Sequence, residues 1–397
     1  MNILLDLIPF QFLGGIGGAP SFTKRVSDEI IGHRRSDTTL FALFDSTMPE
    51  GRQYSYKDYA REHGLTLIDR TTGTLPSLIE KHHIDVFFIP IGQFHADSPL
   101  TGIGCKTVMF IHDIFDVERN DNLIDLMLFK DSHVGRWENF KRIYCFATGR
   151  WKSGAQRKYD NIMKLYTAPS TVPYTVSAYT RSSLLYYFPE LASNPPRVCY
   201  SPMKEAVAGD TIENAALRQM VDSGTPYLLM IAADREYKNV QLLLKVFPRL
   251  QRDYPGLHLL TLKFGRTIGP HHTDIDFLSD SDLEHAYRHA RALVFPSFFE
   301  GFGYPPIEAM RHGTPTVAAN VTSIPEVVGD AAELFSPFYP ADLYRALRQV
   351  LDHRDEYRDR MARRLHELKK TQEEQLQRLV EEVYSDTDAP PTKPHKP

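Results

Sequence analysis

Short apolar runs alternate with longer stretches of helical period along most of the chain. Because these runs lack an alternation of apolar and polar positions, they predict strands that helices cover on both faces. The strand and helix alternation favours parallel sheets, so we interpret the chain as α/β with two doubly wound units. Nine runs predict strands: Asn2–Ile8, Thr39–Phe44, Ile84–Pro90, Thr107–His112, Tyr174–Ser177, Pro226–Ile231, Leu257–Leu262, Ala292–Pro296 and Thr314–Ala319.

Turn-forming residues cluster between positions 193 and 225, around a polar stretch. We therefore expect one domain over 1–202 and a second over 203–365. An amphipathic pattern around Leu343 to Leu351 predicts a late helix of the second domain, and another pattern predicts a C-terminal helix over 366–384. The proline-rich end, 385–397, is typical of a disordered tail.

The overall charge narrows the classes of function. The chain has 46 Lys and Arg against 50 Asp and Glu, and its net charge of -4 argues against nucleic acid as the main partner. Cys105, Cys145 and Cys199 form no C-x-x-C pair, which disfavours a disulfide framework and points to a reducing cytoplasm. We expect neither a membrane span nor a secretory signal, since apolar runs are short and no Lys or Arg precedes Lys24.

The stretch from Phe295 to Pro315 carries the strongest chemical signal. A strand ends near Pro296, a glycine loop follows, and a short helix is expected to start at Pro305 or Pro306 and to end at Gly313. Gly301 and Gly303 let the backbone approach a ligand. The amides of Phe302, Gly303 and Tyr304 then lie at a helix N-terminus, where the dipole favours an anion, so the loop predicts a phosphate cradle.

Two carboxylates, Glu300 and Glu308, flank this loop with seven residues between them. Ionised carboxylates only accept hydrogen bonds, which suits sugar hydroxyls for Glu300 and a ribose diol for Glu308. Each residue alone has a plainer explanation, with Glu300 capping a turn and Glu308 serving as a first-turn acid. The spacing of the whole segment favours the functional interpretation.

The segment from Glu300 to Glu308, Glu-Gly-Phe-Gly-Tyr-Pro-Pro-Ile-Glu, resembles the E-x7-E motif of the retaining glycosyltransferases of family 4. The resemblance is dense from Leu283 to about Leu351 and thin elsewhere. It implies a GT-B fold, in which two Rossmann-like domains face each other across a cleft. The first domain would be the acceptor side, the second would bind the nucleotide sugar, and the C-terminal helix would cross back to the first domain. The motif looks most like bacterial mannosyltransferases that build surface polysaccharide such as the O-antigen of lipopolysaccharide.

Other positions match this family in the expected order. Lys238 resembles the cation that binds the donor pyrophosphate, although an ordinary solvated lysine at a helix start is the alternative. The arginine usual before that lysine is Tyr237 here, so Arg235 is a candidate substitute. His112, at the end of a strand, resembles the histidine placed over the donor sugar; a buried core histidine is the alternative.

The loop with Gly14, Gly15 and Gly17 resembles the family's glycine-rich loop beside the donor phosphate. It is not a dinucleotide fingerprint, because the G-x-G-x-x-G frame from Gly15 requires glycine where Pro20 stands. This difference argues against a dehydrogenase.

Some signals for metal ions have simpler explanations. Asp280-Ser281-Asp282 fits a D-x-D metal motif, but Ser279 is better interpreted as a helix N-cap with Glu284 near the capping-box position. The pairs His82-His83 and His271-His272 are expected to be exposed loop histidines. We therefore expect no metal site.

A basic segment runs from Arg136 to Lys164 and includes Trp137 and Trp151. It predicts either peripheral contact with an anionic membrane or a solvated helix face. The basic residues are Arg136, Lys141, Arg142, Arg150, Lys152, Arg157, Lys158 and Lys164.

The resemblance, together with these observations, implies a metal-independent, retaining hexosyltransferase that uses a nucleotide diphosphate sugar, with mannose as the first candidate sugar and GDP-mannose as the first candidate donor. The acceptor would be a hydroxyl of a growing glycan or lipid-linked saccharide, and no cofactor is expected. The hypothesis assigns His112, Lys238 and Glu300 to catalysis. The alternatives are an inactive sugar-nucleotide-binding subunit and an NAD-dependent oxidoreductase. Donor, nucleobase, linkage, acceptor and oligomeric state stay open.

Overall fold

The computed structural model describes residues 1–11, 17–97, 100–119, 140, 144, 147–148, 150–204, 207, 209 and 211–385. Contacts divide these residues into two compact units. Unit 1 comprises the described residues up to 119, those of 147–204 and 371–385. Unit 2 comprises residues 140 and 144 and the described residues of 207–370.

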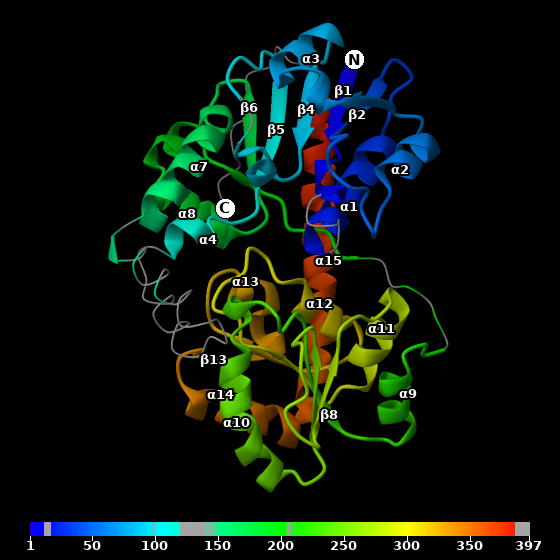
Figure 1. Cartoon of the computed structure of the whole chain (residues 1–397), viewed down its shortest axis with the longest axis vertical. Helices are drawn as coiled ribbons and strands as arrows, with labels where there is room; N and C mark the ends of the chain where they lie inside the picture. Colours follow the sequence, from blue (N-terminus) through cyan, green and yellow to red (C-terminus); the bar gives the residue numbers. More distant parts are fainter. Residues whose placement is uncertain are drawn as a thin grey trace. The chain divides into compact units, whose positions relative to one another are not determined.

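Unit 1 is built on seven parallel strands in the order β3-β2-β1-β4-β5-β6-β7 (Figure 1). Residues on α3, α7 and α8 pack on one face, with Leu78, Ile162 and Leu184 in the core against Phe87 and Met109. The strands are β1 (Asn2–Asp6), β2 (Thr39–Phe44), β3 (Thr66–Asp69), β4 (Val86–Ile89), β5 (Lys106–Ile111), β6 (Thr171–Thr175) and β7 (Arg197–Val198); the helices are α1 (Gly18–Gly32), α2 (Tyr56–His63), α3 (Leu75–Lys81), α4 (Phe115–Glu118), α7 (Arg150–Tyr166) and α8 (Ala178–Tyr187).

Unit 2 has six parallel strands in the order β10-β9-β8-β11-β12-β13. Helices cover both faces: residues of α10 and α14 belong to one apolar cluster, and residues of α9 and α11 to the other. The strands are β8 (Tyr227–Met230), β9 (His258–Leu262), β10 (His272–Ile275), β11 (Ala292–Phe295), β12 (Thr316–Ala319) and β13 (Ala332–Phe335); the helices are α9 (Ala215–Asp222), α10 (Val240–Asp253), α11 (Asp280–His289), α12 (Tyr304–Arg311), α13 (Ile324–Val328) and α14 (Pro340–Asp352).

The two sheets confirm the expected α/β class with two doubly wound units. In both, the chain adds strands first to one side of its first strand and then to the other, so the order reverses between β1 and β4 and between β8 and β11. Ligands of such sheets bind at this switch point, beyond the carboxyl ends of the strands. The loops after β1, β4, β8 and β11 are therefore the first places to look for a site.

The last helix, α15 (Arg358–Val383), supplies residues to both units. Its first part binds unit 2 through Arg364, which donates hydrogen bonds to the carbonyl oxygens of Glu326 and Val327. Its later part belongs to unit 1, where Glu382 forms ion pairs with Lys106 and Arg197. A single helix thus contributes to two cores.

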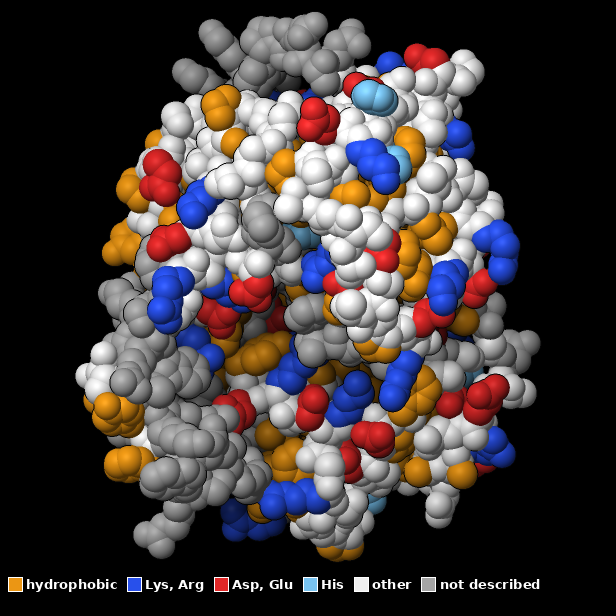
Figure 2. All heavy atoms as spheres, turned by 45° about the horizontal axis from the view of Figure 1, so that its top comes forward, with side chains coloured by type: hydrophobic (Ala, Val, Ile, Leu, Met, Phe, Trp, Pro, Cys, Tyr) orange, Lys and Arg blue, Asp and Glu red, His pale blue; other side chains and the backbone are white. Residues whose placement is uncertain are grey.

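The surface carries charges of both signs. On the face shown in Figure 2, the described Lys and Arg side chains are interspersed with Asp and Glu. Among the described helices, none is long and apolar enough to cross a bilayer. Of the basic segment, Arg136, Lys141 and Arg142 lie outside the described residues, as do the side chains of Arg150 and Lys152; Arg157 and Lys164 are exposed on α7, and Lys158 pairs with Asp116 at 3.0 Å.

Candidate active site

The switch point of unit 2 brings Lys238 and Glu300 together. Lys238 follows β8 and ends a short 3-10 helix, Glu236–Lys238, and Glu300 lies in the loop after β11. The Lys238 Nζ atom donates to Glu300 Oε1 at 2.5 Å, and the two side chains are 8% and 13% exposed. Two residues separated by 62 positions in sequence therefore form one charged pair at the carboxyl ends of the central strands.

The burial of Lys238 is inconsistent with an ordinary solvated lysine. Its ammonium lies 4.8 Å from the centre of the Phe295 ring, a cation–π contact. The next residue, Asn239, has a left-handed backbone with φ 57° and donates from its side chain to the carbonyl oxygens of Pro296 and Pro337. The Asn239 turn therefore holds the backbone at Lys238 close to the C-terminal end of β11.

The Glu300 loop is fixed from outside its own segment. Thr322 Oγ1 accepts a hydrogen bond from the Glu300 amide at 3.2 Å. Ser323 is fully buried, and its hydroxyl lies 2.9 Å from the Glu300 carbonyl oxygen and 3.0 Å from that of Phe302. Nothing in the local pattern around Glu300 indicated these partners; the signal would have been a Thr-Ser pair just after the neighbouring strand β12.

The glycine loop leads into α12 as expected, but the helix begins at Tyr304, one residue earlier than predicted. Gly303 is its N-cap with φ 104°, a conformation that favours glycine. Phe302 is buried and Gly301 precedes it, so backbone groups rather than the Phe302 side chain face any ligand of this helix end. The helix dipole makes this end attractive for an anion.

Glu308 differs from the expectation in two ways. It is the fifth residue of α12, beyond the first turn, which contains no acid. Its Oε2 atom also accepts a hydrogen bond from the hydroxyl of Tyr287 on α11, at 2.6 Å. The earlier helix start causes the first difference, and the partner from α11 is a contact that sequence spacing does not reveal.

Arg235 lies near the same pair. It is exposed and donates to the Tyr237 hydroxyl at 2.9 Å. Neighbouring atoms partly desolvate the guanidinium, which opposes its charge, but Tyr237, Asp234 and Glu300 together hold the pKa of Arg235 above its ordinary value. The side chain thus adds positive charge close to Glu300.

His112 lies in unit 1, directly after β5. Its Nε2 atom is 2.9 Å from the Pro90 carbonyl oxygen, which can only accept, so Nε2 carries the proton and Nδ1 is left as the acceptor. The Phe22 ring packs edge-on at 4.5 Å. Burial lowers the pKa of His112 to about 4, which keeps the imidazole neutral at pH 7.

The glycine-rich loop is described only at its end. Gly14 and Gly15 lie outside the described residues. Gly17 has φ 118°, and its amide donates to the Gln53 side chain at 3.1 Å. Pro20, which excludes the dinucleotide fingerprint, sits in the first turn of α1.

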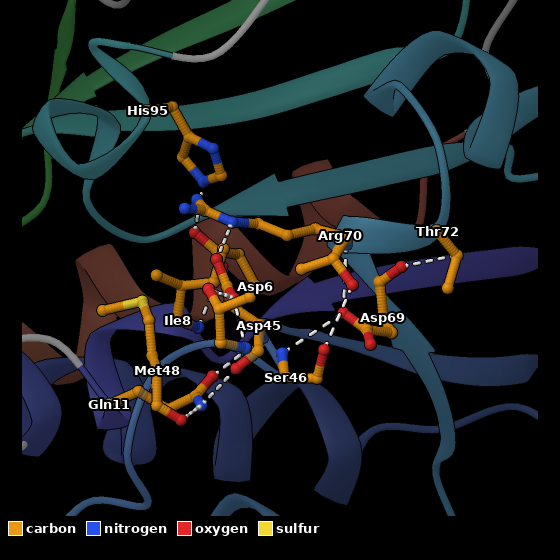
Figure 3. A network of polar contacts seen from close by, with 12 residues as sticks. Asp6, Ile8, Gln11, Asp45, Ser46, Met48, Asp69, Arg70, Thr72 and His95 are labelled. Atoms are coloured by element: carbon orange, nitrogen blue, oxygen red, sulfur yellow. Dashed lines mark hydrogen bonds and ion pairs between the residues drawn. The ribbon is translucent and has the colours of Figure 1, made fainter.

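Unit 1 holds a polar network at the carboxyl ends of β1, β2 and β3 that the sequence analysis did not identify (Figure 3). Asp6 Oδ2 lies 2.8 Å from His95 Nε2, and both side chains are fully buried. Asp6 Oδ1 also accepts from the Ile8 amide at 3.0 Å. Arg70 donates to Asp45 at 2.5 Å; burial opposes the charge of Asp45, but hydrogen bonds from Thr47 and Arg70 hold its pKa below the ordinary value. Acids placed directly after successive apolar strands were the available signal.

Residues considered for metal binding have structural partners. Ser279 is the N-cap of α11, as expected, and Asp282 accepts hydrogen bonds from the amides of Glu213 and Asn214. Glu284 does not complete a capping box: it pairs with Arg311, the last residue of α12, and with His312, the C-cap of that helix. The expectation for His272 is wrong, because it is buried in β10 and bonds Thr261 at 2.8 Å.

Known proteins are similar to this chain. Residues 225–353 match the family model described as "Glycosyl transferases group 1". The Escherichia coli protein "Serotype-specific mannosyltransferase WbdA" is 23% identical over 410 residues, which cover 92% of this chain and 46% of WbdA. A 63-residue stretch is 52% identical to "O-antigen chain mannosyltransferase B" of Escherichia coli and covers 16% of each protein. The chain thus spans less than half the length of WbdA.

The fold also occurs among solved structures. The crystal structure of WaaG, a glycosyltransferase involved in lipopolysaccharide biosynthesis, has a TM-score of 0.61 to this chain. The match covers 97% of this chain and 100% of WaaG at 14% identity. The fold is therefore GT-B, and the two sheets of seven and six strands are its two Rossmann-like domains.

Proposed function

We propose that this chain, whose residues 225–353 form a glycosyltransferase group 1 domain, is a retaining hexosyltransferase that transfers mannose from GDP-mannose to a hydroxyl of a growing O-antigen glycan. The observation that supports it best is the Lys238 and Glu300 pair beside the start of α12. It combines a cation, a helix N-terminus and a carboxylate, which suit a diphosphate and a sugar. The mannosyltransferases similar to the chain support the choice of sugar.

In the proposed reaction, the bond between the anomeric carbon and the pyrophosphate oxygen breaks, and a bond from the acceptor oxygen forms on the same face. The acceptor proton passes to the leaving phosphate oxygen, so no covalent enzyme intermediate is required. Negative charge grows on the pyrophosphate in the transition state. Lys238, Arg235 and the α12 N-terminus would stabilise it as fixed positive charges, and this supports a mechanism without a metal ion.

The pairing of Lys238 with Glu300 is compatible with donor binding. An ammonium has three N–H donors, and Glu300 takes one, so further N–H groups of Lys238 can reach phosphate oxygens. Glu300 Oε1 would stay bound to Lys238 while the carboxylate accepts from the sugar hydroxyls. Glu308 is proposed to bind the ribose diol. His112 is proposed to accept, at Nδ1, a hydrogen bond from a hydroxyl of the transferred sugar.

The first test is a thermal-shift panel of GDP, UDP, dTDP and ADP with their sugars, because a ligand stabilises the fold that binds it. GDP and GDP-mannose should give the largest shift. Incubation with GDP-mannose and an O-antigen acceptor should then yield a product whose anomeric configuration matches the donor. Nucleotide binding without any glycosylated product would instead indicate an inactive subunit. NAD is added to the panel as a further ligand, and stabilisation by NAD alone would indicate an oxidoreductase.

Domain limits and membrane contact belong to the same proposal. The acceptor domain is proposed to end near 202, the donor domain near 365, and 366–384 to pack on the first domain. Exposed Arg157 and Lys164 on α7 support weak contact with anionic lipid. Co-sedimentation with phosphatidylglycerol vesicles should rise with the anionic fraction and fall with salt.

A further inference from the structure

Tyr287 is a buried partner of Glu308 in the proposed donor site. It lies on α11, its side chain is 1% exposed, and its hydroxyl reaches Glu308 Oε2 at 2.6 Å. Burial, together with the neighbouring Glu308 charge, raises the pKa of Tyr287 well above its ordinary value. The phenol therefore stays protonated at neutral pH and donates to the carboxylate.

The position of this hydroxyl is determined by several contacts. The Tyr287 ring stacks on the His312 ring, with centroids 6.1 Å apart and planes 8° from parallel. The Tyr287 carbonyl oxygen accepts from the Thr314 hydroxyl at 2.6 Å. Glu284, one turn earlier on α11, pairs with both Arg311 and His312. These bonds join α11 to α12 and leave the tyrosine little freedom.

A carboxylate held at one oxygen has a defined orientation. An untethered glutamate has three rotatable bonds, and ordering it costs side-chain entropy. The bond from Tyr287 meets part of that cost during folding, before any ligand arrives. A hydrogen bond to a charged group is also stronger than one between neutral groups, so Tyr287 restrains the carboxylate effectively. The ribose diol would then meet a carboxylate that is already oriented.

We propose that Tyr287 is a positioning residue that orients Glu308 for the ribose hydroxyls of the donor nucleotide. This inference rests on the proposed function, since it assumes that Glu308 reads the ribose. It differs from a role in stability alone, because the effect of removing the hydroxyl should depend on whether the ligand has ribose hydroxyls. That dependence can be measured with paired nucleotides.

The experiment compares GDP with 2′,3′-dideoxy-GDP by calorimetry. In Tyr287→Phe the ring and its stack remain, so the variant should fold, and its Kd for GDP should rise about tenfold, or about 1.4 kcal/mol. Its Kd for the dideoxy nucleotide should change less than twofold. Tyr227→Phe is the matched control: Tyr227 is equally buried and donates to the Ala286 carbonyl oxygen on the same helix at 2.8 Å, without touching Glu308. It should leave both affinities unchanged.

Two results would overturn the inference. An equal loss of affinity for both nucleotides in Tyr287→Phe means that the tyrosine has a general structural role. No loss of affinity for GDP means that Glu308 does not need the tyrosine. Should Tyr287→Phe not fold, Glu308→Asp is the second variant: it withdraws the carboxylate from both the Tyr287 hydroxyl and the ribose, so it should lose the same discrimination. Full discrimination in this variant would mean that Glu308 does not bind the ribose, which overturns the ribose role in the proposed function and the inference that rests on it. Should the wild-type chain bind GDP and its dideoxy analogue equally, the ribose role of Glu308 in the proposed function fails instead.

Discussion

The two sheets of this protein have the same order around their first strands, and each carries a hydrogen-bonded pair of ionisable side chains across its switch point. In unit 2 the pair is Lys238 and Glu300, from the loops after β8 and β11. In unit 1 it is Asp6 and His95, from the end of β1 and the turn after β4. The first pair keeps some exposure, whereas the second is fully buried.

The two pairs occupy the same place in their sheets, but their difference in exposure indicates different roles. A pair that reaches the surface can exchange part of its bonding for a ligand, and its neighbours at the switch point, the glycine loop and α12, suit that role. A sealed pair has no such partner and can only hold its two loops together. We infer that the unit 2 pair serves binding and that the unit 1 pair braces the turn that follows β1, through the bond from the Ile8 amide to Asp6.

The largest expected effect tests the unit 2 pair. Lys238→Ala and Glu300→Ala should each lower kcat/KM for transfer by roughly 10³-fold, about 4 kcal/mol, because fixed charges that stabilise the transition state are lost. Initial rates with saturating acceptor measure this. A single substitution leaves its partner unpaired, so Lys238→Met/Glu300→Gln, which neutralises both, is the folding control: it should stay folded and remain inactive. Near-normal turnover in either single variant would contradict the site assignment.

The corresponding change in unit 1 should affect stability. Asp6→Ala removes one partner of a fully buried pair, which costs about 1–3 kcal/mol of unfolding free energy because the buried N–H of His95 loses its acceptor. Urea denaturation followed by circular dichroism measures the loss. The double variant Asp6→Asn/His95→Gln restores a neutral hydrogen bond and should recover at least half of it. If Asp6→Ala were as stable as the wild type but inactive, the comparison would break, since the sealed pair would then belong to catalysis.

Acid should weaken unit 1 through His112. Its folded pKa of about 4 lies below the ordinary value of 6.5, so between these values the unfolded chain binds a proton that the native chain does not. The free energy of unfolding therefore falls as pH falls from 6.5 to 4, with an upper limit of about 3 kcal/mol. The loss stays below this limit because the ring keeps some contact with water. Burial raises the pKa of Glu118 to about 7, which acts in the opposite direction by removing stability as pH rises from 4.5 to 7.

A comparison with His112→Gln isolates the histidine, because Glu118 is present in both proteins. The difference in urea stability between wild type and variant should narrow as pH falls from 7 to 4. A constant difference over that range would mean that His112 titrates normally in the folded protein.

How far the sequence predicts the fold depends on where a strand lies. The nine predicted strands are the interior strands of the two described sheets, although β6 begins three residues before its predicted run and overlaps only the start of that run. The four that were not predicted, β3, β7, β10 and β13, are the edges. Interior strands are apolar on both faces and form continuous runs, whereas edge strands such as β10, His-Thr-Asp-Ile, mix polar with apolar residues and have no such signature.

The site divides in the same way. The Glu300 to Glu308 loop is continuous in sequence, so its glycines and acids could be identified before the structure. Tyr287 and Ser323 come from other elements, and only the packing of α11 and the turn after β12 places them there. In unit 1 the unpredicted edge strand β3 carries Asp69 and leads to Arg70, so this network could not be assembled from the sequence.

The smallest expected effect tests whether the loop that is continuous in sequence binds the nucleotide without support from distant residues. Ser323 is fully buried and makes two hydrogen bonds to loop carbonyl oxygens, so Ser323→Ala should raise the Kd for GDP about fivefold, near 1 kcal/mol, by loosening the backbone at Glu300. Ser297→Ala is the matched control: this serine is as buried and follows β11, but its hydroxyl has no hydrogen-bond partner among the described residues, so its removal should leave the Kd unchanged. Calorimetry at one temperature compares the two. Equal affinities in both variants would show that the loop holds its shape without Ser323, and the distinction between a contiguous site and one that depends on distant residues would then disappear for unit 2.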